Sequence, residues 1–505
     1  MTIIVMDNTI LNVAIPSLIR DLDASNSEVQ WIIDSYTLVF AGLLLTTGSL
    51  SDRFGRKGAL QAGIVLFMIG SASSALSNSA TQLIITRAFM GIGGALIMPS
   101  TLSLLTNTFR DPRERGRAIA IWAGFSGVGV ALGPIVGGLL LKHFSWSSVF
   151  WVNIPIGLGA LGVGAVILPT SREASDNKLD PIGSLLSMIG LGALLYGIIE
   201  VPGKGWSDAG VIAGFVAGVG AIGAFIFWER HSAHPMLDMA YFKNPRFTAA
   251  NSAVTLTFFA MFGSLFLMAQ YWQLVHGYTP LEAGVRLVPY ALAMMIVAPM
   301  SARFVEKLGS KRIITIGLCI VTSALILLSF IRRDTPYPLA IIPYAIMAAG
   351  IGFTMPPATE SVMGSLPRDK AGVGSAVNDT TRQMGGALGV ALIGSVVASV
   401  FSSRVDDAAR EFGVTGADLV KSRASLGGAL EVGSTLGDRA NGFVNSVKDA
   451  FVAGLSTGLR LSAVVVVLAA FVVWRYLPAR AADHVPAASP DELTNDVIAA
   501  AVAGD

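Results

Sequence analysis

The stretch Gly48-Ser-Leu-Ser-Asp52-Arg53-Phe-Gly55-Arg56-Lys57 holds one carboxylate, three cations and two glycines within ten residues. Apolar runs flank it, from Trp31 to Leu50 and from Ala59 to Leu76. Glycine permits tight turns and close helix approach, and a carboxylate at a helix end can pair with nearby cations or with the terminus of another helix. A short charged turn between two apolar segments of membrane length indicates a loop at a membrane surface.

The composition indicates a polytopic membrane protein. Of 505 residues, 53% are hydrophobic and 13% are charged, against about 25% charged in an ordinary soluble domain. The formal net charge is +2 and the cations are spread over turns, so nucleic acid is not expected as a partner. The single cysteine, Cys319, excludes an intrachain disulfide. With no phosphate-loop sequence, metal-ligand spacing or nucleophile–base arrangement, we expect no ATP-driven pump, no metal or other cofactor, and no enzyme.

Apolar runs of about 20 residues predict roughly fourteen membrane-spanning helices. They lie near residues 1–18, 30–50, 58–77, 82–105, 118–141, 147–168, 182–201, 209–228, 248–274, 284–303, 312–331, 338–362, 373–400 and 451–474. The turns at 53–57, 110–117 and 303–312 are rich in Arg and Lys and fall on one side. By the positive-inside rule this side is cytoplasmic, which predicts a bacterial cytoplasmic-membrane protein with both termini inside.

The spans fall into two blocks of six, separated by a pair of helices that Asp180-Pro181 and Pro202-Gly-Lys-Gly205 bracket. A weaker echo of the opening stretch, over 299–312, appears in the second block. We expect the following organisation: an N-terminal six-helix bundle over 1–168, a two-helix insertion with a cytoplasmic linker over 169–246, a C-terminal six-helix bundle over 247–474 with an external loop over 402–449, and a cytoplasmic tail over 475–505. Residues 1–18 are barely long enough to span a membrane, so we expect the second half of a truncated first helix.

The opening stretch resembles the signature between helices two and three of the major facilitator superfamily, where it acts as a conformational latch on the cytoplasmic side. The residues that match are Gly48, Asp52, Arg53, Gly55, Arg56 and Lys57. The run from Met6 to Pro16 resembles the first-helix signature of that superfamily's fourteen-helix drug/proton antiporters, which include quaternary-ammonium and multidrug exporters. The resemblance implies an all-α fold of two six-helix bundles with an inserted helix pair, working as a monomer. The plainer alternative is an ordinary basic turn of a membrane protein.

A glycine-rich run, Gly-Val-Gly-Val-Ala-Leu-Gly-Pro-Ile-Val-Gly-Gly over 127–138, resembles the antiporter motif of drug exporters. Its matching residues are Gly129, Gly133, Pro134, Gly137 and Gly138. The motif is absent as a rule from symporters, so the resemblance favours export over uptake. The alternative is a seam of small residues that serves only helix packing.

Ionisable side chains inside membrane spans commonly cost about 2.5–3.5 kcal/mol, so each one is a candidate functional group. Asp34 and Asp379 match positions where related exporters of cationic drugs carry an acid, and Asp7 lies in the first-helix signature. Arg87 resembles the superfamily's fourth-helix motif associated with proton coupling. The alternatives are helix–helix hydrogen bonds for Asp7 and Asp34, snorkelling of Arg87 to an interface, and neutralisation of Asp379 by Arg382 one helical turn away.

A carboxylate withdrawn from water can alternate between a proton and a lipophilic cation. We therefore expect a secondary active transporter that exports amphiphilic or cationic drugs by proton antiport, with small amphiphiles, protons and membrane lipids as its partners. Aromatic and methionine side chains such as Trp122, Phe258 and Met294 could line its cavity, although core packing or lipid contact is the commoner role of such residues. Two alternatives stay open: an exporter of an endogenous lipid or metabolite, and a membrane sensor on a transporter scaffold.

Overall fold

The structure is a computed structural model, and it describes residues 2–22, 26–109, 111–169, 180–232, 235–367 and 370–478. Three predicted features lie outside these residues: Arg110 of the second basic turn, residues 170–179 of the insertion, and the tail beyond residue 478.

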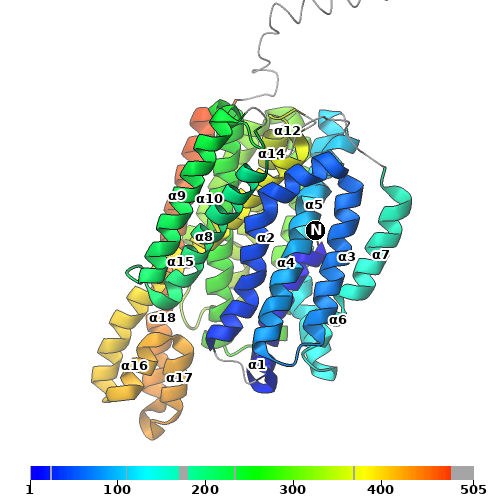
Figure 1. The fold of residues 1–505 in the computed structure, drawn as a ribbon. Helices are drawn as coiled ribbons and strands as arrows, with labels where there is room; N and C mark the ends of the chain where they lie inside the picture. The colour runs from blue at the N-terminus through cyan, green and yellow to red at the C-terminus, as the bar shows by residue number, and fades with distance from the viewer. Residues whose placement is uncertain are drawn as a thin grey trace, which may run out of the picture.

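The described residues fold into helices joined by short turns (Figure 1). In chain order these are α1 (Thr2–Leu22), α2 (Asn26–Phe54), α3 (Arg56–Ala75), α4 (Ala80–Thr108), α5 (Pro112–His143), α6 (Ser148–Trp151), α7 (Asn153–Ile167), α8 (Pro181–Lys204), α9 (Ala209–His231), η1 (Met239–Lys243), α10 (Pro245–Gln270), η2 (Tyr271–Val275), α11 (Pro280–Arg286), α12 (Val288–Leu308), α13 (Ser310–Leu328), α14 (Tyr337–Met363), α15 (Ala371–Phe412), α16 (Gly416–Ala424), α17 (Leu426–Ser434), η4 (Gly437–Arg439) and α18 (Ala440–Tyr476).

The predicted all-α polytopic fold is confirmed. Thirteen helical segments of the described residues are long and apolar enough to cross a membrane, and α1 adds a shorter apolar stretch, Thr2–Ile15. Some of the spans are interrupted locally: the one predicted over 147–168 is divided into α6 and α7 at Val152, and α10 passes into the π-helix η2.

Two hydrophobic cores divide the molecule into halves. One core is built mainly from α1 to α6, and the other mainly from α10 to α18. The α8–α9 hairpin packs against α2 of the first half and α15 of the second. Because α2 and α15 also contact each other, the hairpin lies beside the seam between the halves (Figure 1).

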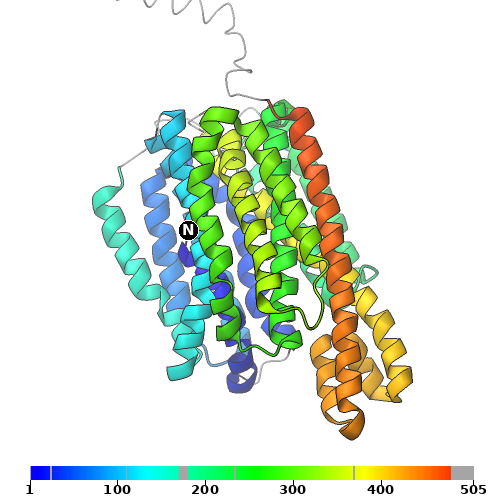
Figure 2. The same cartoon turned by 180° about the vertical axis from the view of Figure 1, so that it is seen from behind.

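Two helices are much longer than a membrane is thick. At about 1.5 Å per residue, the 42 residues of α15 extend about 63 Å and the 37 residues of α18 about 55 Å, against about 30 Å of hydrocarbon. With α16 and α17 they form a projection at the end of the bundle opposite the turn at Gly55 (Figures 1 and 2). We call these two ends of the bundle the projection end and the Gly55 end.

The predicted external loop over 402–449 is mostly helical in the structure. Neither Gly nor Pro occurs between Ser395 and Phe412, so nothing in the chain stops α15 at the membrane surface. The helix ends at Gly413, whose φ of 73° is the left-handed conformation that glycine adopts readily. Val405 and Phe443 contribute to a buried apolar centre within the projection.

Candidate functional site

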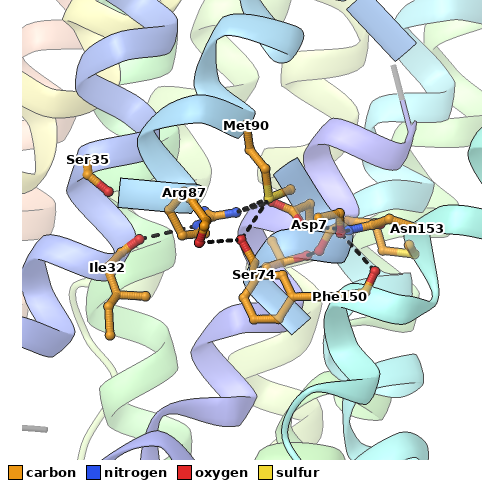
Figure 3. Close-up of polar contacts among 12 residues, drawn as sticks. Asp7, Ile32, Ser35, Ser74, Arg87, Met90, Phe150 and Asn153 are labelled. Carbon is orange, nitrogen blue, oxygen red and sulfur yellow. Dashed lines mark hydrogen bonds and ion pairs between the residues drawn. The ribbon is translucent and has the colours of Figure 1, made fainter. Parts of the chain in front are cut away.

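A fully buried ion pair joins α4 to α1 in the first half. Arg87 Nη1 lies 2.5 Å from Asp7 Oδ2, and the two side chains are 0% and 1% exposed. Arg87 Nε also donates to the Ile32 carbonyl of α2 at 3.2 Å, and its guanidinium carbon lies 4.5 Å from the centre of the Tyr36 ring. Figure 3 shows Arg87 between Ile32 and Asp7. Arg87 therefore holds three helices together, and the predicted alternative of snorkelling to an interface is wrong.

The other oxygen of Asp7 faces α7. Asn153 Nδ2 donates to Asp7 Oδ1 at 2.8 Å and to Ser71 Oγ at 3.1 Å, and Ser71 in turn donates to the Phe150 carbonyl at 2.8 Å (Figure 3). Asn153 is 0% exposed. The sequence analysis assigned it no role, although a carboxamide at the start of an otherwise apolar span is itself a signal.

Asp34 also lies on α2, two residues from Ile32 and two from Tyr36, the groups of α2 that Arg87 contacts. Because residues two apart on a helix do not share a face, Asp34 lies on another face of α2 than Tyr36. Its side chain is partly buried, whereas that of Asp7 is 1% exposed, so Asp34 is the more accessible of the two carboxylates.

Asp52 of the latch stretch caps a helix of the opposite half. Its Oδ2 and Oδ1 accept hydrogen bonds from the backbone N–H of Gly372 at 2.7 and 2.9 Å, and Oδ2 accepts a third from Val373 at 3.2 Å. These residues begin α15, where unsatisfied N–H groups and the helix dipole favour a negative charge. Arg56 donates to the same carboxylate at 3.0 Å. The latch stretch thus contacts both halves.

Glycines allow α2 and α15 to touch at this point. A Cβ on Gly48 would lie 2.6 Å from both Ala376 Cβ and the Gly372 carbonyl oxygen, and one on Gly372 would lie 2.6 Å from Asp52 Cγ. Gly55 makes the turn itself, with a φ of 102°. Close backbone contact is therefore a condition for the Asp52 cap.

The remaining latch residues contact their own half. Lys57 Nζ donates to the carbonyls of Ala165 and Leu168 at 2.8 Å each, at the carboxyl end of α7, where a cation is favoured. The Arg53 guanidinium lies 5.6 Å from the ring centre of its neighbour Phe54.

Two further ion pairs cross between the halves at the Gly55 end. Arg115 of α5 donates to both oxygens of Glu360 on α14, at 2.6 and 2.9 Å, and the side chains are 11% and 13% exposed. Arg117 of α5 pairs with Glu306 of α12 at 2.9 Å, with 57% and 30% exposure. The sequence analysis placed Arg115 and Arg117 in a basic turn but did not pair them.

The antiporter motif places α5 between the two halves. Cβ atoms on Gly129, Gly133 and Gly137 would meet Val5, Thr9 and Ile10 of α1, the helix that carries Asp7. A Cβ on Gly138 would lie 2.9 Å from Leu281 of α11 in the second half, and Pro134 contacts Gly284 of the same helix. The motif therefore permits close packing on both sides of α5.

Asp379 and Arg382 form an ion pair within α15. Arg382 Nη1 lies 3.5 Å from Asp379 Oδ1, and the side chains are 5% and 2% exposed. The pairing that the sequence left open is present in the structure. Both residues lie on α15, the helix whose start Asp52 caps.

Residues 1–390 match the model of the Major Facilitator Superfamily. The chain belongs to this superfamily.

Relatives within the superfamily are drug exporters or resistance proteins. The chain is 34% identical to the multidrug efflux pump LfrA of Mycolicibacterium smegmatis over 472 residues, which cover 93% of each protein. It is 32% identical to the tetracenomycin C resistance and export protein of Streptomyces glaucescens, covering 93% of this chain and 88% of the relative. It is 31% identical to the methyl viologen resistance protein SmvA of Salmonella typhimurium, with 93% and 95% covered.

Solved structures of the superfamily share the fold. The human organic anion transporter MFSD10 superposes with a TM-score of 0.59 at 13% identity, covering 94% of this chain and 97% of its own. A bacterial homologue of the human lysosomal transporter Spinster, in an inward-facing conformation, gives 0.56 at 18% identity and 96% coverage of both chains. The protein is thus a multi-pass membrane transporter of the superfamily, related to drug efflux pumps.

The candidate site combines buried charges with close helix packing. Its described residues contain no group of three His, Cys, Asp or Glu side chains that could hold a metal ion. What they do contain is a buried acid paired with a buried cation in each half, Asp7 with Arg87 and Asp379 with Arg382. Removal of one partner of such a buried pair leaves the other charge uncompensated.

Proposed function

We propose that this transporter exports amphiphilic, cationic drugs across the bacterial cytoplasmic membrane in exchange for protons. The observation that carries the proposal is the fully buried Asp7–Arg87 ion pair, which ties three helices of the first half together. The names of its relatives support drug export, and one of them is a resistance protein for methyl viologen, a dication.

Protonation of Asp7 supplies the coupling in this proposal. A protonated Asp7 no longer balances the charge of Arg87, and removing one partner of a buried pair costs about 3–5 kcal/mol. Arg87 would retain only the Ile32 carbonyl and the Tyr36 ring among its contacts described above. The helices around it must therefore rearrange, and α1 passes the movement through the glycines of α5 to α11 of the second half.

Asp34 is assigned the first contact with protons and cations. It lies on α2, the helix that supplies two contacts of Arg87, and its side chain is more accessible than that of Asp7. A cation and a proton that both bind Asp34 then compete for one carboxylate. Such competition is the requirement for antiport.

The Gly55 end is assigned to the cytoplasm, and α18 ends on that side (Figure 2). The Arg- and Lys-rich turns at this end support the assignment. In the conformation seen in the structure, the Asp52 cap and the Arg115–Glu360 and Arg117–Glu306 pairs join the two halves at the Gly55 end and keep it closed. Export then requires the predicted bundles over 1–168 and 247–474 to rock apart at this end and release these contacts, with the protein acting as a monomer.

The proposal is tested in proteoliposomes that contain the full chain and an imposed proton gradient. Uptake of a fluorescent lipophilic cation is followed for wild type, Asp7→Asn, Asp34→Asn and the control Asp407→Asn, whose carboxylate is 77% exposed in the projection. Wild type and the control should take up the cation only when the gradient is imposed. Asp7→Asn and Asp34→Asn should lose this gradient-driven uptake. For Asp7→Asn, retained cation–cation counterflow shows that the variant is folded. For Asp34→Asn, which removes the proposed cation contact itself, a monodisperse peak in size-exclusion chromatography shows it.

Two outcomes contradict the proposal. Uptake that persists when the gradient is collapsed excludes proton antiport. Transport of a neutral amphiphile or lipid probe but of no cation, with Asp34→Asn indistinguishable from wild type, favours an exporter of an endogenous lipid or metabolite.

A further inference from the structure

The guanidinium of Arg382 lies between two aromatic rings that come from different halves. Its central carbon is 4.8 Å from the ring centre of Trp122 on α5 and 5.4 Å from that of Phe258 on α10. Arg382 is 4% exposed and Trp122 is 9% exposed. Two aromatic faces around one position attract an organic cation, and they do so most strongly where water is excluded.

The polar groups around Arg382 are incompletely bonded. Asp379 Oδ2, Arg382 Nε and Asn378 Nδ2 have no hydrogen-bond partner among the described residues, and all three residues are at least nine-tenths buried. Buried polar atoms are normally satisfied, so three unsatisfied ones within one helical turn require an explanation. The Asp379–Arg382 contact is also long, at 3.5 Å.

One further contact holds Arg382 where it is. Its Nη2 donates to Thr359 Oγ1 on α14 at 3.0 Å. The side chain is therefore fixed by a hydroxyl and two rings rather than by a close ion pair with Asp379. Among the described residues, no hydrogen-bond donor reaches Asp379 Oδ2 within bonding distance, so this oxygen can accept a further donor or cation.

We infer that a lipophilic organic cation binds between Trp122 and Phe258, where it displaces the Arg382 guanidinium and pairs with Asp379. We call this binding position the seat. The inference rests on the proposed export of cations. Two cations cannot share the seat, because charges a few ångströms apart repel strongly in a medium of low dielectric constant. Arg382 is then a built-in competitor that sets how tightly a cation binds, and a neutral amphiphile escapes this competition.

Side chains from both halves of the protein form the seat. Trp122 belongs to α5 of the first half, whereas Phe258, Asp379 and Arg382 belong to the second. The Trp122 indole N–H donates to Thr101 Oγ1 of α4 at 3.4 Å, which helps to fix the ring in place. A cation seated between the two rings therefore contacts both halves at once.

The experiment measures equilibrium binding of tetraphenylphosphonium, a lipophilic cation, and of triphenylphosphine oxide, a neutral molecule of similar shape, to the purified full chain. Arg382→Gln removes the competing charge while keeping a planar group that can reach Thr359. It should bind tetraphenylphosphonium roughly tenfold more tightly than wild type, with triphenylphosphine oxide changed little. Asp379→Asn should weaken binding of the cation by roughly the same factor and spare the neutral probe.

Arg286→Gln is the matched control. Arg286 also lies over an aromatic ring, 3.9 Å from the centre of Tyr278, but on α11 rather than in the seat. It should leave both affinities unchanged. Arg382→Lys, which keeps the charge, gives a second reading in case Arg382→Gln does not fold, and should bind the cation no more than about twofold more tightly than wild type.

Weaker or unchanged cation binding by folded Arg382→Gln overturns the inference, as does an equal gain for both probes. A gain for Arg382→Lys of the size expected for Arg382→Gln also overturns it, because charge would then not be the cause. If wild type binds tetraphenylphosphonium and Arg382→Gln binds it more tightly, but proteoliposomes show no gradient-driven flux, the seat stands and proton antiport fails. If wild type shows the flux but Arg382→Gln gains no affinity, antiport stands and the seat fails.

Discussion

The α2–α3 turn and the α12–α13 turn have equivalent places in the two halves, yet they hold the Gly55 end together in different ways. Each turn has a glycine with positive φ, 102° at Gly55 and 81° at Gly309, and each has an acid three residues earlier, Asp52 and Glu306. Each acid contacts the start of a long helix of the other half. Asp52 binds backbone N–H groups of α15, whereas Glu306 binds the side chain of Arg117 on α5.

The difference in partner sets the strength of the two contacts. Backbone donors at a helix start are fixed in direction, and Asp52 is only 11% exposed. Glu306 and Arg117 are 30% and 57% exposed, so solvent screens them and two flexible chains must be ordered. The glycine that brings α2 against α15, Gly48, corresponds to Ala302 in the second turn. An internal repeat can thus keep the position of a turn while only one copy retains a strong contact.

The largest effect is expected from Gly372→Ala, which should break the stronger contact. Its Cβ would lie 2.6 Å from Asp52 Cγ and meet the Gly48 carbonyl oxygen, so α2 and α15 must separate. Overpacking of this kind costs about 1–3 kcal/mol. The separation also breaks the hydrogen bonds between Asp52 and the start of α15, so the two costs add and the Gly55 end should open more than in any other variant. Spin labels at Phe54 and Phe304, both exposed, in a Cys319→Ser background measure the distance between the halves. Gly58→Ala is the control, since a Cβ there meets nothing within 4 Å, and an unchanged distance in Gly372→Ala contradicts the prediction.

Asp52→Asn and Glu306→Gln compare the two turns directly. Each change removes one charge and keeps an acceptor. Loss of the charge-assisted bonds of Asp52 should cost about 1.5–3 kcal/mol, and loss of the exposed Glu306 pair about 0.2–1 kcal/mol. The closed population, read by the same labels, should fall about tenfold or more for Asp52→Asn and less than about fivefold for Glu306→Gln. Equal effects would show that the two turns contribute alike.

The smallest effect is expected from Arg117→Gln, at about 1 kcal/mol or less. It should also vanish at high salt, because the Debye length falls from about 10 Å at about 0.1 M to about 3 Å at about 1 M. Arg115→Gln breaks the less exposed, bidentate pair with Glu360 and should keep its effect at high salt. The measurement is the label distance across a sodium chloride series. A salt-independent effect of Arg117→Gln would contradict the prediction, because it would show that salt does not screen the Arg117–Glu306 pair.

The sequence predicted the helices and some of the polar partners, such as Arg382 for Asp379, but not the partners that depend on how helices cross. Apolar runs located the helices, and Gly55 located a turn whose geometry the structure confirms. The partner of Arg87 depends on how three helices cross, and Asp7 lies 80 residues away in the chain. For Asp52 the sequence predicted a nearby cation or a helix terminus, and the structure has both, Arg56 and the start of α15. Which helix it caps could not be predicted, because backbone N–H groups have no residue signature of their own. Asn153 and the helical projection were missed because hydropathy scores apolar runs and not single carboxamides or polar helices.

The continuity of α15 gives the molecule a mechanical lever. One uninterrupted helix begins at the Asp52 cap, passes the ion pair of Asp379 with Arg382, and ends in the projection at Phe412. A tilt of about 10° about its first residue would move the last by about 11 Å, given about 63 Å of helix. A fluorophore or a binding protein attached to the projection would therefore report, with amplification, each opening and closing at the distant Gly55 end, and a clamp placed there would stop the cycle without entering the membrane.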